Sequence, residues 1–437
     1  MKKVIALLLV MALSVSVFTA CGKTADPTEV KTESTSAGEK PDDGTITLNV
    51  ALWDYEVEPG WKAMFDTYME LHPNVHLEVI DIPSTDYNTK LNVMLNGGSD
   101  LDVYLAKDAG TLCDFEAKGQ CEPLDEYIVA DGIDTSVYNG IAESMKLNDK
   151  QCALPVNTSF YVLYYNKDLF DAANKPYPSG DMTWEEFEQL ALEMTSGSGE
   201  NKVYGAMFHS WPSLVTNWAV QDGKHTTMDY QTGYDFFKPY YEMVLRLQDA
   251  GAIQDFGELK SANIHYSGAF AAGNVAMMPM GIWFASTMAS KMKNNEANMN
   301  AWGIATIPHP STVEAGYTVG ASTPACINAA SKQKDAAWDF LKFITGEEGQ
   351  KVYAEAGGIS AIQNDETRAL IASAEGMPDN MAEALKVKNI VPDGPIAPNI
   401  TELSDMIAQE HTMIMLGEST VDEGLKSMSE RAAEILG

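Results

Sequence analysis

Residues 154–170, with the sequence LPVNTSFYVLYYNKDLF, decide the fold. The stretch is rich in aromatic and β-branched residues, which favour an extended strand. Pro155 stands near its start, and Asn166, Lys167 and Asp168 end it with residues typical of turns. Strand and helix patterns lie on both sides of the stretch. We therefore interpret it as the first crossing of the chain between two lobes.

The segment before this strand alternates between strand and helix patterns. Apolar residues alternate along Thr45–Trp53, and further strands are predicted at Val75–Ile82 and Leu101–Leu105. The residues between the strands have the apolar spacing of helices, as between Trp61 and Tyr68. Strands that alternate with helices predict βαβ units and a parallel sheet.

The segment after the crossing strand continues in the same manner. Thr183–Glu186 has the pattern of a capping box, which predicts the start of a helix. Val275–Met280 is an apolar strand that leads into Gly281-Ile282-Trp283. Gly316–Ile327 is predicted to cross back to the first lobe, and helical patterns follow it.

The length and charge of the chain limit its partners. With 437 residues the chain is too long for one compact core and suits two lobes. Its net charge is −33, and because Lys2 and Lys3 are the only charged residues among residues 1–20, removing these leaves −35. Such a balance argues against nucleic acid as a partner, because the phosphate backbone would be repelled.

The N-terminus has the pattern of a targeting segment. Lys2 and Lys3 precede the apolar run Val4–Val17, which is too short for a membrane span of about 20 residues. Thr19-Ala20-Cys21-Gly22 follows and resembles the lipobox of bacterial lipoproteins. This resemblance implies a signal peptide at 1–20 and a diacylated Cys21 as the membrane anchor.

The residues after Cys21 predict a disordered tether up to residue 44, because large apolar side chains are almost absent from it. The alternative for the N-terminus is an ordinary signal peptide followed by a chance cysteine. In the first case the protein is held on the extracytoplasmic face of the cell membrane.

Known catalytic and metal-binding patterns are missing from the sequence. It has no Gly-x-Gly-x-x-Gly, P-loop, Gly-x-Ser-x-Gly or His-Glu-x-x-His motif. His72 and His76 are four residues apart, but Pro73 between them interrupts a helix. We therefore expect no catalytic residue, no bound metal and no cofactor.

Four cysteines remain once Cys21 is set aside: Cys113, Cys121, Cys152 and Cys326. The expected compartment permits disulfides. Cys113 could pair with Cys121 if Gly119 breaks the helix between them, and Cys121 could instead pair with Cys152. Free buried thiols are the other possibility, and the sequence does not decide among the three.

Aromatic residues at the ends of predicted strands indicate a ligand-binding site. Four tryptophans hold such positions: Trp53, Trp211, Trp218 and Trp283. In open α/β sheets ligands bind beyond the carboxyl ends of the strands. An aromatic ring covers the C–H face of a sugar, and a neighbouring carboxylate such as Asp54 binds its hydroxyl groups. For each tryptophan the alternative is a packing role.

Several segments, in their order along the chain, resemble the bacterial extracellular solute-binding proteins of family 1, whose maltose- and multiple-sugar-binding members serve ABC importers. They are Gly97–Val103, with Leu101 in place of the usual proline, Cys121–Asp125, Leu154–Phe170, Ala269–Met278 with Gly281–Trp283, and Lys334–Gln350.

The resemblance implies an α/β fold of the type II periplasmic-binding-protein kind, with two discontinuous lobes around an interlobe cleft. The first lobe would combine residues 45–156 with 321–365, and the second would combine 160–316 with 378–437. The chain would cross between them near residues 155–160, 317–321 and 365–378.

The resemblance also suggests the residues that bind the ligand. Trp283 would stack on it, Trp53 and Asp54 would contact it from the loop after the first strand, and Asp108 would do so after the third strand. Asn157 and Ser159 would contact it at the lobe crossing. Members that bind maltodextrin carry an aromatic pair on the helix after a Pro-Asn-Ile turn. Here Pro398-Asn399-Ile400 is followed by Met406-Ile407, which argues against maltodextrin itself.

The function expected from the resemblance is the capture of a small solute by a monomer that does no chemistry. The solute would be a sugar or an oligosaccharide, passed to the permease subunits of an ABC importer. One alternative is a receptor of the same fold for a polyamine or another cation, which Asp54, Asp102 and Asp108 would bind. The other is an extracellular enzyme that acts on glycans through two cleft carboxylates.

Overall fold

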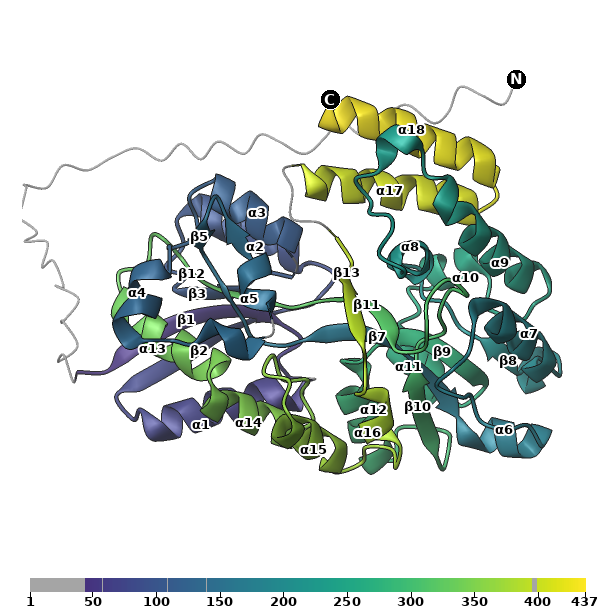
Figure 1. Cartoon of the computed structure of the whole chain (residues 1–437). Coiled ribbons are helices and arrows are strands. Elements are labelled where there is room, and N and C mark those ends of the chain that lie inside the picture. Colours follow the sequence, from purple (N-terminus) through teal and green to yellow (C-terminus); the bar gives the residue numbers. More distant parts are fainter. Residues whose placement is uncertain (1–43, 57, 108, 139, 395–398) are drawn as a thin grey trace, which may run out of the picture. The chain divides into compact units, whose positions relative to one another are not determined.

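A computed structural model describes residues 44–437, with gaps at residues 57, 108, 139 and 395–398 (Figure 1). The predicted signal peptide, Cys21 and the tether lie outside the described residues. The described chain alternates between strands and helices and forms two main sheets. The expected α/β architecture with two lobes is therefore confirmed.

The first sheet is built mainly from the N-terminal part of the chain. Its strand order is β2 (Val75–Ile82), β1 (Ile46–Trp53), β3 (Val103–Leu105), β12 (Pro324–Ile327) and β6 (Leu154–Pro155). The strand β1 runs parallel to β2, with Ile46 opposite Val75 and Trp53 opposite Ile82. The strand β12 is antiparallel to both β3 and β6. A strand from much later in the sequence thus completes the first lobe.

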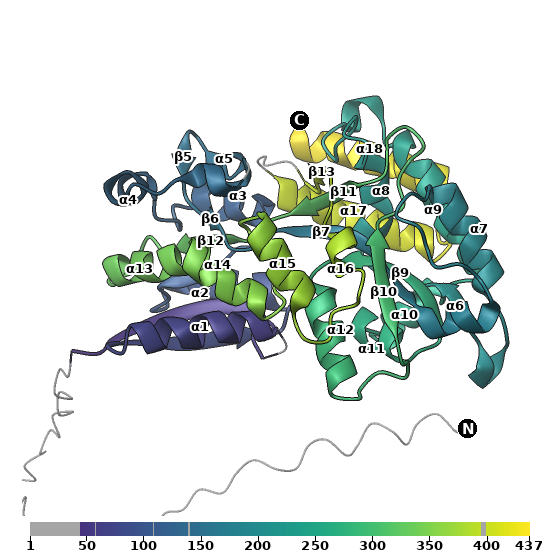
Figure 2. The same cartoon turned by 60° about the horizontal axis from the view of Figure 1, so that its bottom comes forward.

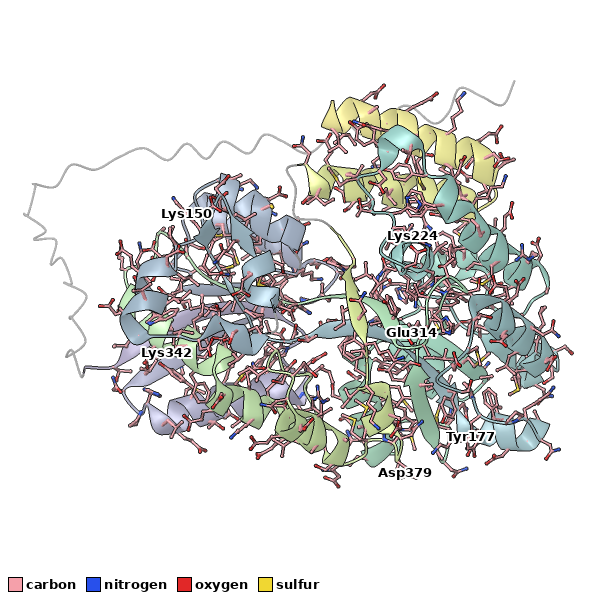
Figure 3. The ribbon with its side chains drawn as sticks, in the orientation of Figure 1. Lys150, Tyr177, Lys224, Glu314, Lys342 and Asp379 are labelled. Atoms are coloured by element: carbon pink, nitrogen blue, oxygen red, sulfur yellow. The ribbon has the colours of Figure 1, made fainter. Side chains whose placement is uncertain are left out.

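Helices cover this sheet and bury the apolar faces that the sequence predicts. On α1, Phe65 is fully buried and meets Phe340 of α13 edge to face, with ring centroids 5.0 Å apart. Lys342 of α13, labelled in Figure 3, donates to Asp131 of α4 at 2.9 Å. The helices of this lobe are α1 (Pro59–Leu71), α2 (Tyr87–Gly97), α3 (Ala109–Ala117), α4 (Asp125–Asp131), α5 (Ile141–Ser144), α13 (Lys334–Thr345) and α14 (Glu347–Glu355). Figure 2 shows α1 alongside α14.

The second sheet is centred on the strand predicted within residues 154–170. Its order is β13 (Asn389–Pro392), β11 (Tyr317–Ala321), β7 (Ser159–Asn166), β9 (Val275–Gly281) and β8 (Tyr204–Ala206), and β10 (Trp302–Thr306) also pairs with β7. The strand β7 is antiparallel to β9, β10 and β11. Its residues from Phe160 to Asn166 are all buried, which explains the continuous apolar and aromatic sequence.

The helices of the second lobe lie on both sides of this sheet (Figure 1). The capping box predicted at Thr183–Glu186 is confirmed: Thr183 accepts from the backbone of Glu186, whose carboxylate accepts from the backbone of Thr183. The α-helices are α6 (Lys167–Ala173), α7 (Trp184–Met194), α8 (Ser213–Val220), α9 (Lys238–Asp249), α10 (Phe256–Ser261), α11 (Tyr266–Ala271), α12 (Phe284–Lys293), α16 (Met381–Ala384), α17 (Ile400–Met415) and α18 (Val421–Leu436). The helix α15 (Asp365–Ser373), in the segment where the third crossing is predicted, contacts both α14 and α16.

The remaining elements are short. A small hairpin joins β4 (Lys146–Leu147) to β5 (Lys150–Gln151), and single 3₁₀ turns occur at Thr135–Tyr138, Gly199–Asn201, Tyr230–Thr232 and Asp235–Phe237. Within the described part of the chain, none of the helices combines the length and the apolar character of a membrane span.

The connections between the two sheets follow the predicted order. The chain leaves the first sheet after β6 and enters the second at β7, and it returns between β11 and β12. The second crossing was expected near residues 317–321, within Gly316–Ile327, and there the strand β11 pairs with β7 and β13 inside the second sheet before the chain returns to the first. The return to the first sheet therefore lies between Ala321 and Pro324. The lobe boundaries themselves stay a prediction.

Candidate ligand-binding site

Two of the predicted site residues, Trp53 and Trp283, lie at or just after the ends of strands from the two sheets. The strand β1 ends at Trp53, and Asp54 turns the chain away with a φ of 54° in the left-handed region. The strand β9 ends at Gly281, and α12 begins at Phe284. Trp283 thus stands at the junction of strand and helix, where the sequence placed it. Such junctions at carboxyl ends of strands are where ligands bind in open α/β sheets.

A small pocket of about 20 Å³ brings three of the predicted residues together. Asn157 and Ser159 from the first crossing line it with Trp283 of the second lobe. Glu58 and Tyr353 line it from the first lobe. The pocket, which is room for only about one or two waters, therefore marks a place where residues of both lobes meet residues of the connection between them.

Trp283 is half-buried, and its contacts fix the orientation of its ring. The indole lies so close over Gly281 that a Cβ there would fall 1.9 Å from it, which only glycine permits. One ring edge meets Tyr161, with centroids 5.6 Å apart. The indole Nε1 donates to the hydroxyl of Tyr266 at 3.2 Å. The ring is thus held rigidly while part of its surface stays accessible.

Tyr266, which contacts Trp283, belongs to a group of four aromatic side chains in the second lobe. We call His209, Trp211, His265 and Tyr266 the aromatic cluster. Their ring centroids are 4.4 Å apart for His209 and Trp211, 4.0 Å for His265 and Tyr266, and 5.5 Å for Trp211 and Tyr266. Trp211, which the sequence singled out, is half-buried within this cluster.

The negative charge of Asp54 in the first lobe acts on His265 of the aromatic cluster. Burial lowers the pKa of His265, and the negative charge of Asp54 opposes that change. Desolvation raises the pKa of Asp54 itself, while a hydrogen bond from the backbone of Ser84 and the charge of Lys107 act the other way. The Ser84 amide donates to Asp54 Oδ1 at 3.2 Å. Residues of opposite lobes therefore influence one another's charge across the site.

Trp53 is held by contacts on the first lobe. Its ring meets Tyr87 edge to face at 5.0 Å, and Lys107 Nζ lies 5.3 Å from its centroid. Lys107 also donates to the hydroxyl of Ser84 at 2.8 Å. Trp53 remains half-buried, so part of its surface is accessible. A cation close to both Trp53 and Asp54 is a feature that the sequence did not reveal.

Glu58 is a site residue that sequence reasoning missed. Desolvation, together with the negative charge of Asp54, raises the pKa of its carboxyl to about 8. At neutral pH the group is therefore mainly a neutral carboxylic acid, which both donates and accepts hydrogen bonds. The sequence around Glu58, which precedes Pro59 at the start of α1, does not indicate a binding residue. Glu58 becomes a site residue through Tyr353, which lines the same pocket but is distant in the sequence.

Asn157 and Ser159 connect two crossings of the chain. The side-chain oxygen of Asn157 accepts from the backbone of Thr323 at 3.0 Å. Ser159 pairs with Ala321 at the start of the β7–β11 ladder. Both residues therefore sit where the two lobes join, and both also line the pocket with Trp283.

One predicted contact is wrong. Trp218 on α8 is fully buried, and its Nε1 donates to the carbonyl of Leu214 at 2.6 Å within the helix. Its ring packs against Trp184 at 4.6 Å and Tyr161 at 5.3 Å. The side chain belongs to the core of the second lobe, because α8 turns this face inward, and it does not reach the cleft.

Other expectations have different outcomes. Asp108 lies outside the described residues. Asp102, part of the alternative cation site, is buried and accepts from the backbone of Asn49 at 2.9 Å and the hydroxyl of Ser331 at 2.5 Å. Its carboxylate is therefore used within the first lobe. Within the described ranges, the histidines, cysteines and acids form no group of three or more that could hold a metal.

Three cysteines of the first lobe, Cys121, Cys152 and Cys326, are buried and form no disulfide. Cys113 is half-buried and does not pair with Cys121 through a disulfide. The sulfur of Cys121 lies 3.0 Å from the hydroxyl of Tyr104. Of the possibilities that the sequence left open, the structure shows thiols without disulfides, three of them in the core of the first lobe.

Known proteins resemble this chain over most of its length. Residues 55–351 match the family described as bacterial extracellular solute-binding protein. A sugar transporter from Rhizobium etli, solved in an open conformation, is 38% identical with a TM-score of 0.76, and the match covers 89% of this chain and 99% of that one.

Two further relatives are more distant. An ABC substrate-binding protein from Listeria monocytogenes, solved with cycloalternan, is 22% identical with a TM-score of 0.77, covering 90% of this chain and 99% of that one. The erythritol/L-threitol-binding protein of Mycolicibacterium smegmatis is 23% identical over 378 residues, which are 79% of this chain and 76% of that protein. The fold is that of type II periplasmic binding proteins. The chain belongs to the bacterial extracellular solute-binding proteins.

Proposed function

We propose that this chain is the receptor of an ABC importer and captures a sugar, a polyol or an oligosaccharide between its two lobes. The observation that carries the proposal is the pocket in which Glu58 and Tyr353 of the first lobe meet Trp283 of the second, with Asn157 between them. A ligand there contacts both lobes only when they are close, so binding favours closure.

The chemistry of the site suits a neutral polyhydroxylated ligand. The accessible parts of Trp53, Trp211 and Trp283 offer aromatic surface to C–H groups. Glu58, as a neutral acid, can donate to one hydroxyl group and accept from another. Several relatives are named for ligands of this class, among them D-mannitol and erythritol.

A cationic ligand suits the site less well. Glu58 is mainly uncharged at neutral pH, and Lys107 places a positive charge beside Asp54 and Trp53. Asp102, on which the polyamine alternative partly depended, is occupied by bonds within the first lobe. A glycan-cleaving enzyme is also disfavoured, because a hydrolase needs two carboxylates on opposite sides of the scissile bond. Asp54 and Glu58 are four residues apart on one lobe, joined by a backbone bond of 3.1 Å.

The lipid anchor and the location belong to the same proposal. The lipobox-like Thr19-Ala20-Cys21-Gly22 supports lipidation of Cys21 and retention of a monomer on the extracytoplasmic face of the membrane. There the receptor would meet the permease subunits of its importer.

A thermal-shift screen followed by calorimetry tests the ligand class. The panel holds erythritol, D-mannitol, maltose, spermidine and putrescine, and the control is incubation with a maltooligosaccharide to detect cleavage. Ligand binding raises the melting temperature by mass action. We expect stabilisation by at least one neutral sugar or polyol and no cleavage. Stabilisation by the polyamines alone, or cleavage of the oligosaccharide, would contradict the proposal.

A further inference from the structure

A small cavity of about 10 Å³ lies inside the second lobe, next to the aromatic cluster. The residues lining it come from α8, α9, α10 and α17, from the loop between α9 and α10 that carries Gln254, and from the segment after β8 that carries His209 of the cluster. Three of them each have one enclosed polar atom without a hydrogen-bond partner in the described part of the chain: His209 Nδ1, Gln254 Oε1 and His411 Nε2. Enclosed polar atoms are rarely left unpaired, so three around one cavity indicate a bound polar molecule.

The size and lining of the cavity select that molecule. A volume of about 10 Å³ is room for about one water, and a buried water makes about three hydrogen bonds. Apolar side chains such as Phe256 and Leu259 form much of the remaining wall. His411 is 2% exposed, so the site is closed to bulk solvent on that side.

The proton positions follow from the neighbour of His411. The hydroxyl of Tyr241, which is fully buried, lies 3.1 Å from His411 Nδ1 and has no other partner in the described residues. Its proton must therefore go to Nδ1. Burial lowers the pKa of His411 to about 3, so the ring is neutral at pH 7. A neutral ring that accepts at Nδ1 carries its proton on Nε2, the enclosed atom without a hydrogen-bond partner in the described part of the chain.

We propose that one buried water accepts from His411 Nε2–H and donates to His209 Nδ1, so that His209 carries its own proton on Nε2 and acts as a specificity-determining donor to the ligand. The second hydrogen of this water goes to Gln254 Oε1. If the amide of Gln254 is turned, it donates to the water instead, and the proton position on His209 is the same.

The exposed nitrogen of His209 is placed to use this proton. Nε2 is not enclosed, and it has no hydrogen-bond partner among the described residues. It belongs to a ring that follows the carboxyl end of β8 and contacts Trp211 and Tyr266. Burial lowers the pKa of His209 to about 4, so the ring is neutral at pH 7 and carries one proton only. That proton is available to a hydroxyl oxygen of the ligand.

The first test needs no ligand. Nitrogen-15 NMR of the histidines in the full-length, ligand-free protein at pH 7 distinguishes the two neutral tautomers of each ring. We expect the Nε2–H form for both His209 and His411. A crystal structure should show one water at about 2.7–3.2 Å from the three unpaired atoms. An Nδ1–H form of His209, or an empty cavity at a resolution that shows ordered waters, would overturn the inference.

The second test rests on the proposed function and uses erythritol, D-mannitol and maltose as probes in calorimetry. His209→Gln keeps an N–H group near the position of Nε2, whereas His209→Leu removes it. For a probe that binds the native protein, we expect about tenfold weaker binding by the leucine variant and a smaller loss for glutamine. If the leucine and glutamine variants bind the probe with the same affinity, His209 does not act as a donor to the ligand. If no probe binds the native protein, the proposed ligand class fails, while NMR still decides the tautomer.

Discussion

Trp283 Nε1 donates a hydrogen bond to the hydroxyl of Tyr266 at 3.2 Å, and this bond holds the indole against the aromatic cluster. The same indole lies over Gly281 and lines the pocket with Glu58 of the other lobe. A ring that is fixed on one side and accessible on the other is suited to stack on a ligand without losing conformational entropy.

Replacing Trp283 with alanine should weaken sugar binding by at least about tenfold, because the stacking surface is lost. The melting temperature of the ligand-free protein should fall only slightly, since the side chain is partly exposed. Trp283→Phe keeps a ring and should retain part of the affinity. Calorimetry and thermal unfolding measure both quantities.

The matched control for this experiment is Trp218→Ala in the core of the same lobe. Because Trp218 is fully buried, its loss should destabilise the fold by roughly 3–5 kcal/mol. If Trp283→Ala behaves like this control in the absence of ligand, or binds sugar normally, Trp283 is a packing residue.

Glu58→Gln should change how stability depends on pH. The unfolded protein loses the Glu58 proton near its ordinary pKa of about 4.3, whereas the folded protein keeps it up to a pKa of about 8. In this window the folded state binds more protons, so the contribution of Glu58 to stability falls as the pH rises. The stability of the variant minus that of the native protein should therefore be larger above pH 8 than at pH 4. Melting temperatures of both proteins across this range provide the measurement, and a difference that does not vary with pH would rule out a raised pKa.

A hydrogen bond between the lobes should support closure. Thr401 of α17 donates to Asp114 of α3 at 2.5 Å, joining the second lobe to the first. Thr401→Val removes this bond and keeps the shape, so sugar affinity should fall by up to about tenfold without any change at the ligand. The control is Thr412→Val on the same helix, whose hydroxyl donates to Ala408 and accepts from Lys260, both in the second lobe. Equal affinities for the two variants would show that the bond does not favour closure.

Lipidation can be tested by mass spectrometry of the protein extracted from membranes. We expect removal of residues 1–20 and a diacylglyceryl group on Cys21. Cys21→Ser should release the protein into the soluble fraction, because one polar residue cannot replace the acyl chains. Native protein found only in the culture fluid with an unmodified N-terminus would contradict the lipid anchor.

The elements that the sequence predicted well are those with a local signal. The capping box at Thr183–Glu186 and the apolar strand before Gly281 depend on neighbours in the chain, and both are confirmed. The position of Trp283 followed from that strand and glycine. Another local signal was overlooked: Asn364 and Thr367 form a capping box that starts α15, although threonine replaces the usual acidic residue.

Other features depend on contacts between distant segments. Trp218 lies at a plausible ligand position in the sequence, but the direction of α8 turns it into the core. Glu58 gains its raised pKa from enclosure by residues that are remote in the chain. The exact place of the return to the first sheet, between β11 and β12, depends on the pairing of β11 with β7 and β13, which are distant in the sequence. None of these three features can be predicted from the residues immediately before and after it in the sequence.

Small-angle X-ray scattering tests the central claim most directly, because it reports whether the two lobes close around a sugar. The radius of gyration of the purified protein is measured alone, with the neutral sugar or polyol that stabilises it most, and with the same compound added to Trp283→Ala. We expect the radius of gyration of the native protein to decrease on binding. At a sugar concentration that saturates only the native protein, we expect the radius of Trp283→Ala to stay unchanged. A native radius that stays the same under saturating sugar would contradict capture by closure of the two lobes.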